Sequence, residues 1–217
     1  MSTRHSAQPD VNTELLRSGI KELGLDLGEL QVGQLKTYLE LLIKWNQAYN
    51  LTAIREPKQM IIKHLLDALS VLPHIKDGPV LDVGTGPGIP GVMLAIARPD
   101  LKFTLVDSNG KKIRFIKQVQ RTLDLPNLEA IQSRVEELPA EQKFQQIVSR
   151  AFTALHQMVK VCHHLLDEGG EFIAMKGTYP EPNQQPLNQQ WNIAEVIELY
   201  VPFLDEQRHL VVVRRSN

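Results

Sequence analysis

The chain has 217 residues, a length typical of one large domain or of one domain with a small appendage. Apolar residues make up 42% and charged residues 23%, which excludes a chain that is mainly disordered. No apolar run could span a bilayer and the first ten residues lack a signal-peptide core, so we expect a cytoplasmic protein. The 24 Lys and Arg residues are balanced by 25 Asp and Glu residues, which gives a formal net charge of -1. Nucleic-acid binding would therefore have to come from a local basic patch.

The first third of the chain has the periodicity of helices. Residues 1–13 are polar and aperiodic, and we predict a frayed terminus there. Residues 14–72 are predicted to be a helical extension, with a second helix over 57–72 that starts at Pro57. The apolar stripe of the earlier helix consists of Leu35, Tyr38, Leu39, Leu42, Trp45 and Tyr49. The remaining residues, 73–217, are predicted to form one further domain.

From Pro79 onward, short apolar runs alternate with helical stretches, which is typical of an α/β fold with a mostly parallel sheet. The predicted strands are 80–83, 103–106, 128–131, 146–149, 171–175, 196–201 and 209–214. The last two are separated by too few residues for a parallel crossover, so they should form an antiparallel hairpin. Pro180, Pro182 and Pro186 indicate an exposed loop before a last short helix.

The strongest motif is the glycine-rich segment LDVGTGPGIPG at residues 81–91, between a predicted strand and a helix predicted from Ile89 to Ala97. Glycines let the backbone turn sharply and approach a ligand closely. Asp107 ends the second strand, 21 residues after Gly86, where a carboxylate can hold both hydroxyls of a ribose. The segment therefore predicts a nucleotide or nucleoside cofactor.

Two cofactor patterns overlap in this segment. G-x-G-x-x-G from Gly86 to Gly91 matches the dinucleotide pattern, and D-x-G-x-G-x-G from Asp82 to Gly88 matches the S-adenosylmethionine pattern. Gly84 directly follows the strand, Asp82 offers a carboxylate near a methionine ammonium, and two prolines remove N–H donors that a pyrophosphate would bind. We therefore favour S-adenosylmethionine, and a dehydrogenase is a distant alternative.

Several sequence blocks resemble one family, the bacterial 16S ribosomal RNA (guanine-N7) methyltransferases, also known as glucose-inhibited division protein B. The blocks are, in chain order, 44–52 (KWNQAYNLT), 64–67, 82–91, 105–112, 133–136, 149–152, 176–177 and 208–211. They extend from about residue 35 almost to the end of the chain. Only the first 30 or so residues carry no such signal.

The resemblance implies a Rossmann-like class I methyltransferase with seven strands and an antiparallel C-terminal hairpin. It implies methyl transfer from S-adenosylmethionine to N7 of a guanine in the decoding-centre loop of 16S rRNA, in the 30S subunit. In the family, cofactor contacts match Gly84, Ile89, Val135, Glu136 and Arg150. Together with the glycine-rich segment and the ribose carboxylate, the expected cofactor-binding residues are Asp82, Gly84, Gly86, Gly88, Ile89, Asp107, Val135, Glu136 and Arg150.

Guanine N7 carries a free lone pair, so its methylation needs positioning and no general base. Arg150 and Lys176 follow the fourth and fifth strands, and we assign them to binding the cofactor carboxylate, guanine O6 or phosphate. Asn50 and His64 are further candidates for positioning the substrate. A local structural hydrogen bond between His64 and Asp67, three residues apart on a helix, is the favoured alternative for that pair.

A basic face is predicted on the helix after Asp107, where RNA could dock. It consists of Lys111, Arg114, Lys117 and Arg121. A simply solvated helix face is the alternative, because such faces are common. Trp45 and Tyr49 could stack on bases, although their place in the apolar stripe favours core packing.

Other functions are weighed against this one. A methyltransferase acting on a small molecule or a protein, and a noncatalytic RNA-binding or division-associated factor, both remain alternatives. The single cysteine, Cys162, cannot form an internal disulfide, and in the segment CHH at 162–164 adjacent helical residues point roughly 100° apart. We therefore expect no metal, and we expect a monomer.

Overall fold

The structure is a computed structural model that describes residues 11–150, 152, 154–179 and 187–216. Its sheet has seven strands in the order β3-β2-β1-β4-β5-β7-β6. These are β1 Val80–Val83, β2 Phe103–Asp107, β3 Leu128–Gln132, β4 Phe144–Ser149, β5 Leu166–Lys176, β6 Trp191–Glu198 and β7 His209–Arg215. β7 pairs antiparallel with both β5 and β6, while the other pairs are parallel. The predicted fold class, strand number and C-terminal hairpin are confirmed.

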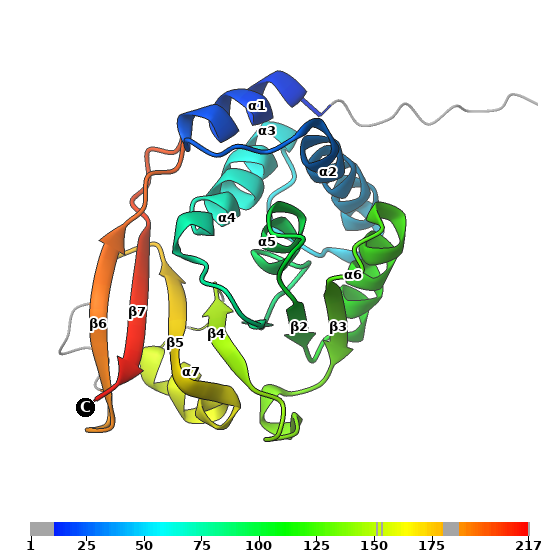
Figure 1. Cartoon of the computed structure of the whole chain (residues 1–217). Coiled ribbons are helices and arrows are strands. Elements are labelled where there is room, and N and C mark those ends of the chain that lie inside the picture. The colour runs from blue at the N-terminus through cyan, green and yellow to red at the C-terminus, as the bar shows by residue number, and fades with distance from the viewer. Residues whose placement is uncertain (1–10, 151, 153, 180–186, 217) are drawn as a thin grey trace, which may run out of the picture.

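The helices lie on both faces of this sheet (Figure 1). They are α1 Thr13–Glu22, α2 Glu29–Tyr49, α3 Pro57–Met60, η1 Ile61–Leu66, α4 Asp67–Leu69, η2 Leu72–His74, α5 Gly91–Ala97, α6 Gly110–Leu123, η3 Val135–Glu137, α7 Leu155–Cys162 and η4 His163–Leu165. In the part of the chain that is described, no helix is long and apolar enough to cross a membrane.

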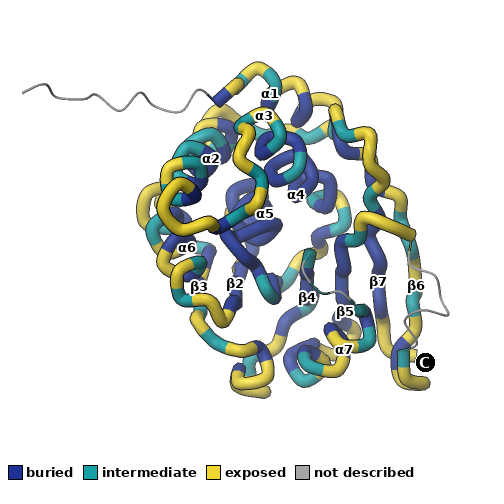
Figure 2. The backbone as a smooth tube through the Cα atoms, turned by 180° about the vertical axis from the view of Figure 1, so that it is seen from behind, coloured by how far each residue is buried: buried dark blue, intermediate teal, exposed yellow. Residues whose placement is uncertain are grey.

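The central strands β1, β2 and β4 bury both of their faces, as the dark central part of the sheet in Figure 2 shows. Successive side chains of a strand point to opposite faces, so Val80 packs with α2, α5 and α6. Leu81 and Val83 instead pack on the opposite face with residues of α7, such as Met158. The sheet is therefore the middle of three layers, and the N-terminal helices share a continuous core with it.

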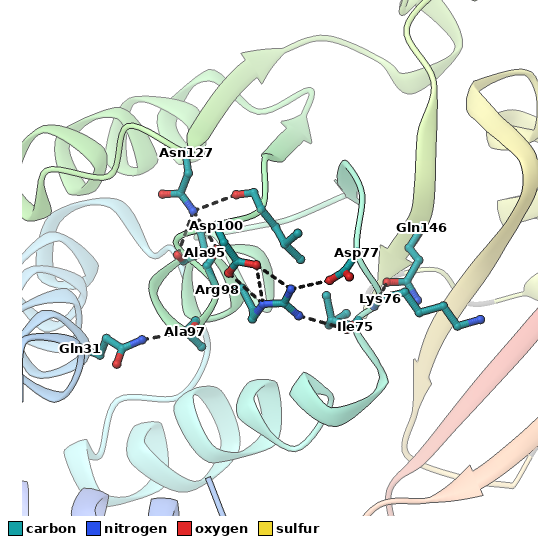
Figure 3. Close-up of polar contacts among 11 residues, drawn as sticks. Gln31, Ile75, Lys76, Asp77, Ala95, Ala97, Arg98, Asp100, Asn127 and Gln146 are labelled. Atoms are coloured by element: carbon teal, nitrogen blue, oxygen red, sulfur yellow. Dashed lines mark hydrogen bonds and ion pairs between the residues drawn. The ribbon is translucent and has the colours of Figure 1, made fainter. Parts of the chain in front are cut away.

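Polar contacts fix the amino-terminal edge of the sheet (Figure 3). Arg98 lies between Asp77 and Asp100, with Nη2 at 2.8 and 2.7 Å from their carboxylates. Asn127 Nδ2 donates to the carbonyls of Ala95, Arg98 and Leu101. These bonds connect the end of α5 to the start of β3, which Asn127 precedes. A cavity of about 530 Å³ lies at this edge, but ligands of open α/β sheets bind at the opposite, carboxyl edge.

Two sequence expectations were wrong. Residues 11–13 are not frayed: Val11 is buried and the Asn12 side chain caps α1 by accepting from Leu15 N at 2.9 Å. The predicted short helix before the last hairpin is absent from the described residues, because β6 already begins at Trp191, whose ring packs on Phe172. The prediction for residues 1–10 and that of a loop from Pro180 to Pro186 lie outside the described residues.

The predicted helix over 57–72 is divided into α3, the π-helical η1 and α4. A π-helix bonds residue i to i+5, so residues three apart no longer stack on one face. The side chains of His64 and Asp67 consequently reach different partners, and no side-chain hydrogen bond joins these two described residues. The local His64–Asp67 bond that the spacing suggested is therefore wrong.

Candidate functional site

The glycine-rich turn joins β1 to α5 at the carboxyl edge of the sheet. Gly84, Gly86 and Gly88 have φ values of 66, 63 and 94°, in the left-handed region that side chains with a Cβ avoid. Gly84 N and Thr85 N both donate to Val106 O, at 2.9 and 3.2 Å, which fixes the turn on β2. The sequence therefore needs glycine here for backbone conformation as well as for ligand approach.

Asp82 lies beneath this turn and holds it together. Its Oδ2 accepts from Thr85 Oγ1 at 2.6 Å and from Gly91 N at 2.8 Å. A Cβ on Gly91 would stand 2.7 Å from that oxygen, so no larger residue fits. Burial raises the pKa of Asp82 to about 6, although both hydrogen bonds favour the carboxylate.

The other carboxylate oxygen of Asp82, Oδ1, is buried and has no hydrogen-bond partner among the described residues. An unpaired buried acceptor is costly unless a ligand donor reaches it. The predicted contact of Asp82 with a methionine ammonium stays a prediction. The structural role of Asp82, whose hydrogen bonds stabilise the turn, was not predicted from the sequence.

Asp107 ends β2 beside the turn, as its spacing predicted. Its Oδ2 accepts from Gly86 N at 3.0 Å and its Oδ1 from Asn109 N at 2.8 Å, with Lys112 Nζ at 3.5 Å. A Cβ on Gly86 would meet nothing within 4 Å, so the space in front of this glycine is open. A carboxylate held at the border of an open glycine face is the arrangement expected for binding the hydroxyls of a ribose.

Other predicted cofactor residues surround the same edge. Val135 is buried and Glu136 exposed in η3, directly after β3. Ile89 is buried at the end of the glycine-rich turn, and its N–H is used by Thr85 O at 2.9 Å. Any contact of Ile89 with a ligand would therefore involve atoms other than this N–H.

A cleft of about 320 Å³ adjoins the carboxyl ends of β4 and β5. Its ionisable lining side chains are Lys63, His64, Asp67, Arg150, Lys176 and Arg208. Four of these are cationic residues and one is an acid, so the cleft attracts anions. The fold thus brings together His64, Arg150 and Lys176, three residues that the sequence singled out.

Asp67 is the buried acid of this cleft and is 3% exposed. Its Oδ2 lies 3.4 Å from Arg150 Nη1 and its Oδ1 lies 3.3 Å from Arg208 Nε. Burial raises the pKa of Asp67, and the two guanidinium groups oppose that rise. Arg150 Nη1 also donates to Lys63 O at 2.9 Å. Arg150 is thus held by Asp67 and by this carbonyl, and Arg208 by Asp67.

His64 is held as a neutral side chain. Its Nε2 lies 2.9 Å from Thr52 Oγ1 and its Nδ1 lies 3.1 Å from Lys63 O. A neutral ring that donates from Nδ1 and accepts at Nε2 satisfies both contacts. Burial, with the nearby Arg150 cation, lowers the pKa of His64 to about 4, so it carries no charge at neutral pH.

Lys176 and Asn50 have different surroundings. Lys176 Nζ donates to Phe152 O at 2.6 Å, and burial lowers the pKa of this ammonium group. Asn50 caps α2 in a left-handed conformation, and its Oδ1 accepts from Arg55 at 2.7 Å. Lys176 lines the cleft and Asn50 does not.

A sequence model of the family described as rRNA small subunit methyltransferase G matches residues 31–211. The chain belongs to this family. Ribosomal RNA small subunit methyltransferase G of Escherichia coli O17:K52:H18 is 48% identical over 201 residues, covering 93% of this chain and 97% of the relative. The protein of the same name from Shigella dysenteriae serotype 1 is 48% identical over 197 residues, covering 91% and 95%.

Solved structures agree on the fold of this rRNA small subunit methyltransferase G family member. A SAM-dependent methyltransferase from Aquifex aeolicus superposes with a TM-score of 0.55 at 16% identity, covering 76% of this chain and 96% of that one. A ribosomal protein L11 methylase from Lactobacillus delbrueckii subsp. bulgaricus gives a TM-score of 0.54 at 15% identity, covering 75% and 80%. At such identities the likeness establishes the methyltransferase fold alone.

The basic face predicted on α6 is present in this family member. Its residues Lys111, Arg114, Lys117 and Arg121 are all exposed, opposite the buried Phe115. The role of this face in RNA binding stays a prediction.

Of the aromatic pair on α2, Trp45 packs on Phe115 with 5.6 Å between the ring centroids, as expected for core packing. Tyr49, the last residue of α2, is 45% exposed and its ring contacts Trp45 with 5.2 Å between ring centroids, so the core-packing prediction was wrong for it.

Two cleft residues of this family member were missed. Arg208 lies just before β7 and Lys63 precedes His64 on η1, and sequence reasoning assigned a role to neither. The signal was present for Arg208, which opens one of the blocks that resemble the family. Within the described residues, no group of three or more His, Cys, Asp or Glu side chains could hold a metal ion.

Proposed function

We propose that this chain transfers the methyl group of S-adenosylmethionine to N7 of one guanine in 16S rRNA of the small ribosomal subunit. One observation carries the proposal: the glycine-rich turn and the cation-lined cleft are neighbours joined at Arg150. Arg150 follows Ser149, whose Oγ donates to Val83 O at the start of the turn at 2.8 Å, and its own Nη1 lies 3.4 Å from Asp67 Oδ2 in the cleft. A cofactor on the turn and an anionic substrate in the cleft would thus lie side by side.

The residues at the turn fit S-adenosylmethionine. The open face of Gly86 leaves room for a ligand, Asp107 can hold ribose hydroxyls, and the unpaired Oδ1 of Asp82 can accept from an ammonium group. Val135 and Glu136 would flank the adenine from η3. When bound, this cofactor supplies an electrophilic methyl group on sulfur.

The cleft suits a base that needs no deprotonation. Guanine N7 attacks with its own lone pair, so the chemistry requires only that the reacting atoms are aligned at about 3 to 3.5 Å. Neutral His64 offers no strong base, while Arg150 and Lys176 are donors suited to guanine O6 or to phosphate. The chain's own contribution is therefore to bind and orient the base and to fix the arginines through Asp67.

The substrate class is tested by the destination of the label. Tritiated S-adenosylmethionine is incubated with 30S subunits, 50S subunits and a metabolite extract, all from cells that lack this protein. We expect incorporation into 30S rRNA alone, in the cytoplasmic ribosome pool. Label in metabolites or protein would support the alternative methyltransferase, and cofactor binding without any transfer would support a noncatalytic factor.

A further inference from the structure

One carboxylate bridges two of the cations that line the cleft. Glu206 lies in the segment between β6 and β7, and its Oε1 is 2.5 Å from Lys63 Nζ. Its Oε2 is 2.9 Å from Arg208 Nη2. Both cations line the cleft, so a single exposed acid connects η1 to the residue that precedes β7.

The two cations differ in how firmly they are held. Arg208 is anchored from below, because its Nε faces the buried Asp67 while its Nη2 is turned to Glu206. Lys63 lies on η1, and its backbone carbonyl accepts a hydrogen bond from Arg150. The Lys63 ammonium and the Arg208 guanidinium come from separate segments and both donate to the Glu206 carboxylate.

An acid of this kind resembles a phosphate in charge and in acceptor geometry. Arginine and lysine bind carboxylate and phosphate oxygens with the same charge-assisted hydrogen bonds. Glu206 itself is half exposed, with 53% of its side chain accessible, so its removal from the cations requires no unpacking of the core. Hydrogen bonds from Lys63 and Arg208 hold the pKa of Glu206 below its usual range, which keeps it ionised at neutral pH.

RNA would bring the competing anion to this place. A guanine that enters the cleft carries a phosphate on each side of its sugar, and most of the affinity of such complexes comes from phosphate contacts. Those phosphates would reach the mouth of the cleft, where Lys63 and Arg208 already converge. Glu206 can leave by movement of its own side chain.

We propose that Lys63 and Arg208 form a phosphate-binding site for the RNA backbone, and that Glu206 occupies this site until the RNA phosphate displaces it. The inference rests on the proposed function for the identity of the anion. Its consequence is that Glu206 opposes substrate binding, which is unusual for a residue so close to a substrate cleft.

The test compares three variants for binding to 30S subunits from cells that lack this protein, measured by co-sedimentation. Glu206→Gln removes the competing charge and should tighten binding about two- to fivefold, the range expected for an exposed ion pair. Lys63→Gln should weaken binding and lower the slope of log affinity against log salt by about 0.7 to 0.9. Glu29→Gln removes an exposed acid that pairs with Arg17 far along the chain, and controls for net charge.

The outcomes separate the two proposals, because binding is read independently of methyl transfer. Tighter binding by Glu206→Gln than by Glu29→Gln supports the phosphate site, whether or not transfer is detected. Equal binding by these two variants, or weaker binding by Glu206→Gln, overturns it. Transfer by the unaltered protein with no gain from Glu206→Gln leaves the proposed function intact and removes the phosphate site alone.

Discussion

The open space at Gly86 gives a sharp prediction, because a methyl group can be placed there without touching the protein. In Gly86→Ala the new Cβ meets nothing within 4 Å, yet the residue keeps a φ of 63°. Gly24→Ala is a matched control: its φ is 68°, nothing lies within 4 Å of its new Cβ, and it lies between α1 and α2. Both variants therefore share the backbone strain and differ in their distance from the proposed cofactor site.

The magnitudes follow from the geometry. A left-handed conformation costs a residue with a Cβ about 1 to 2 kcal/mol, so both variants should lose that much unfolding free energy. For a chain of this size, this corresponds to a fall in Tm of roughly 2 to 8 °C. Only Gly86→Ala should also lose cofactor affinity, because overfilling a packed contact costs about 1 to 3 kcal/mol.

The assay is thermal unfolding with and without S-adenosylmethionine. At 100 times the Kd, the ligand should stabilise the unaltered protein and Gly24→Ala by about 2.7 kcal/mol. A tenfold loss of affinity would reduce this gain to about 1.4 kcal/mol in Gly86→Ala at the same concentration. Equal stabilisation of the two variants would refute the assignment of the space at Gly86 to the cofactor.

Three further predictions concern ionisable groups. The pKa of Asp82 is about 6 in the folded protein, whereas that of an unfolded aspartate is about 3.9, so the folded state favours the protonated carboxyl. The free energy of unfolding should therefore fall by about 3 kcal/mol as the pH rises between these values. Denaturant unfolding of Asp82→Asn should not show this fall. His64→Gln keeps an acceptor for Thr52, so the pH profile of kcat/KM between pH 5 and 8 should match that of the unaltered enzyme, and a lost ionisation would identify His64 as a base. Reversing Lys117 and Arg121 to Glu should weaken RNA binding and flatten its salt dependence, and unchanged binding would remove this face of α6 from the RNA site.

Local patterns predicted the sheet because each strand is a short apolar run with its own borders. Val80–Val83 was predicted to the residue, and the short link before His209 was enough to predict an antiparallel hairpin. β6 was predicted at 196–201 but extends from Trp191 to Glu198, because the alternation from Trp191 onward is weak and its pairing with β7 decides its conformation. The glycine-rich turn was found because the backbone conformation itself requires glycine.

The cleft could be predicted only in part, because it is built from contacts between distant segments. Arg150 and Lys176 were found because each follows a strand at the ligand-binding edge. Asp67 gave no sign of its two arginine partners, since its contact with Arg208 depends on the placement of β7 beside β5. The π-helical turn of η1, which turns His64 and Asp67 toward different partners, follows from tertiary packing that spacing alone does not reveal.

The atom that accepts the methyl group is the most direct test of the account. Labelled 16S rRNA from the transfer reaction is digested to nucleosides and separated by chromatography against methylated standards. We predict that the label is found in 7-methylguanosine, as expected for a site that aligns a base and provides no strong general base. Label in a nucleoside whose methylation requires removal of a proton, such as a methylated exocyclic amine or ribose hydroxyl, would contradict it.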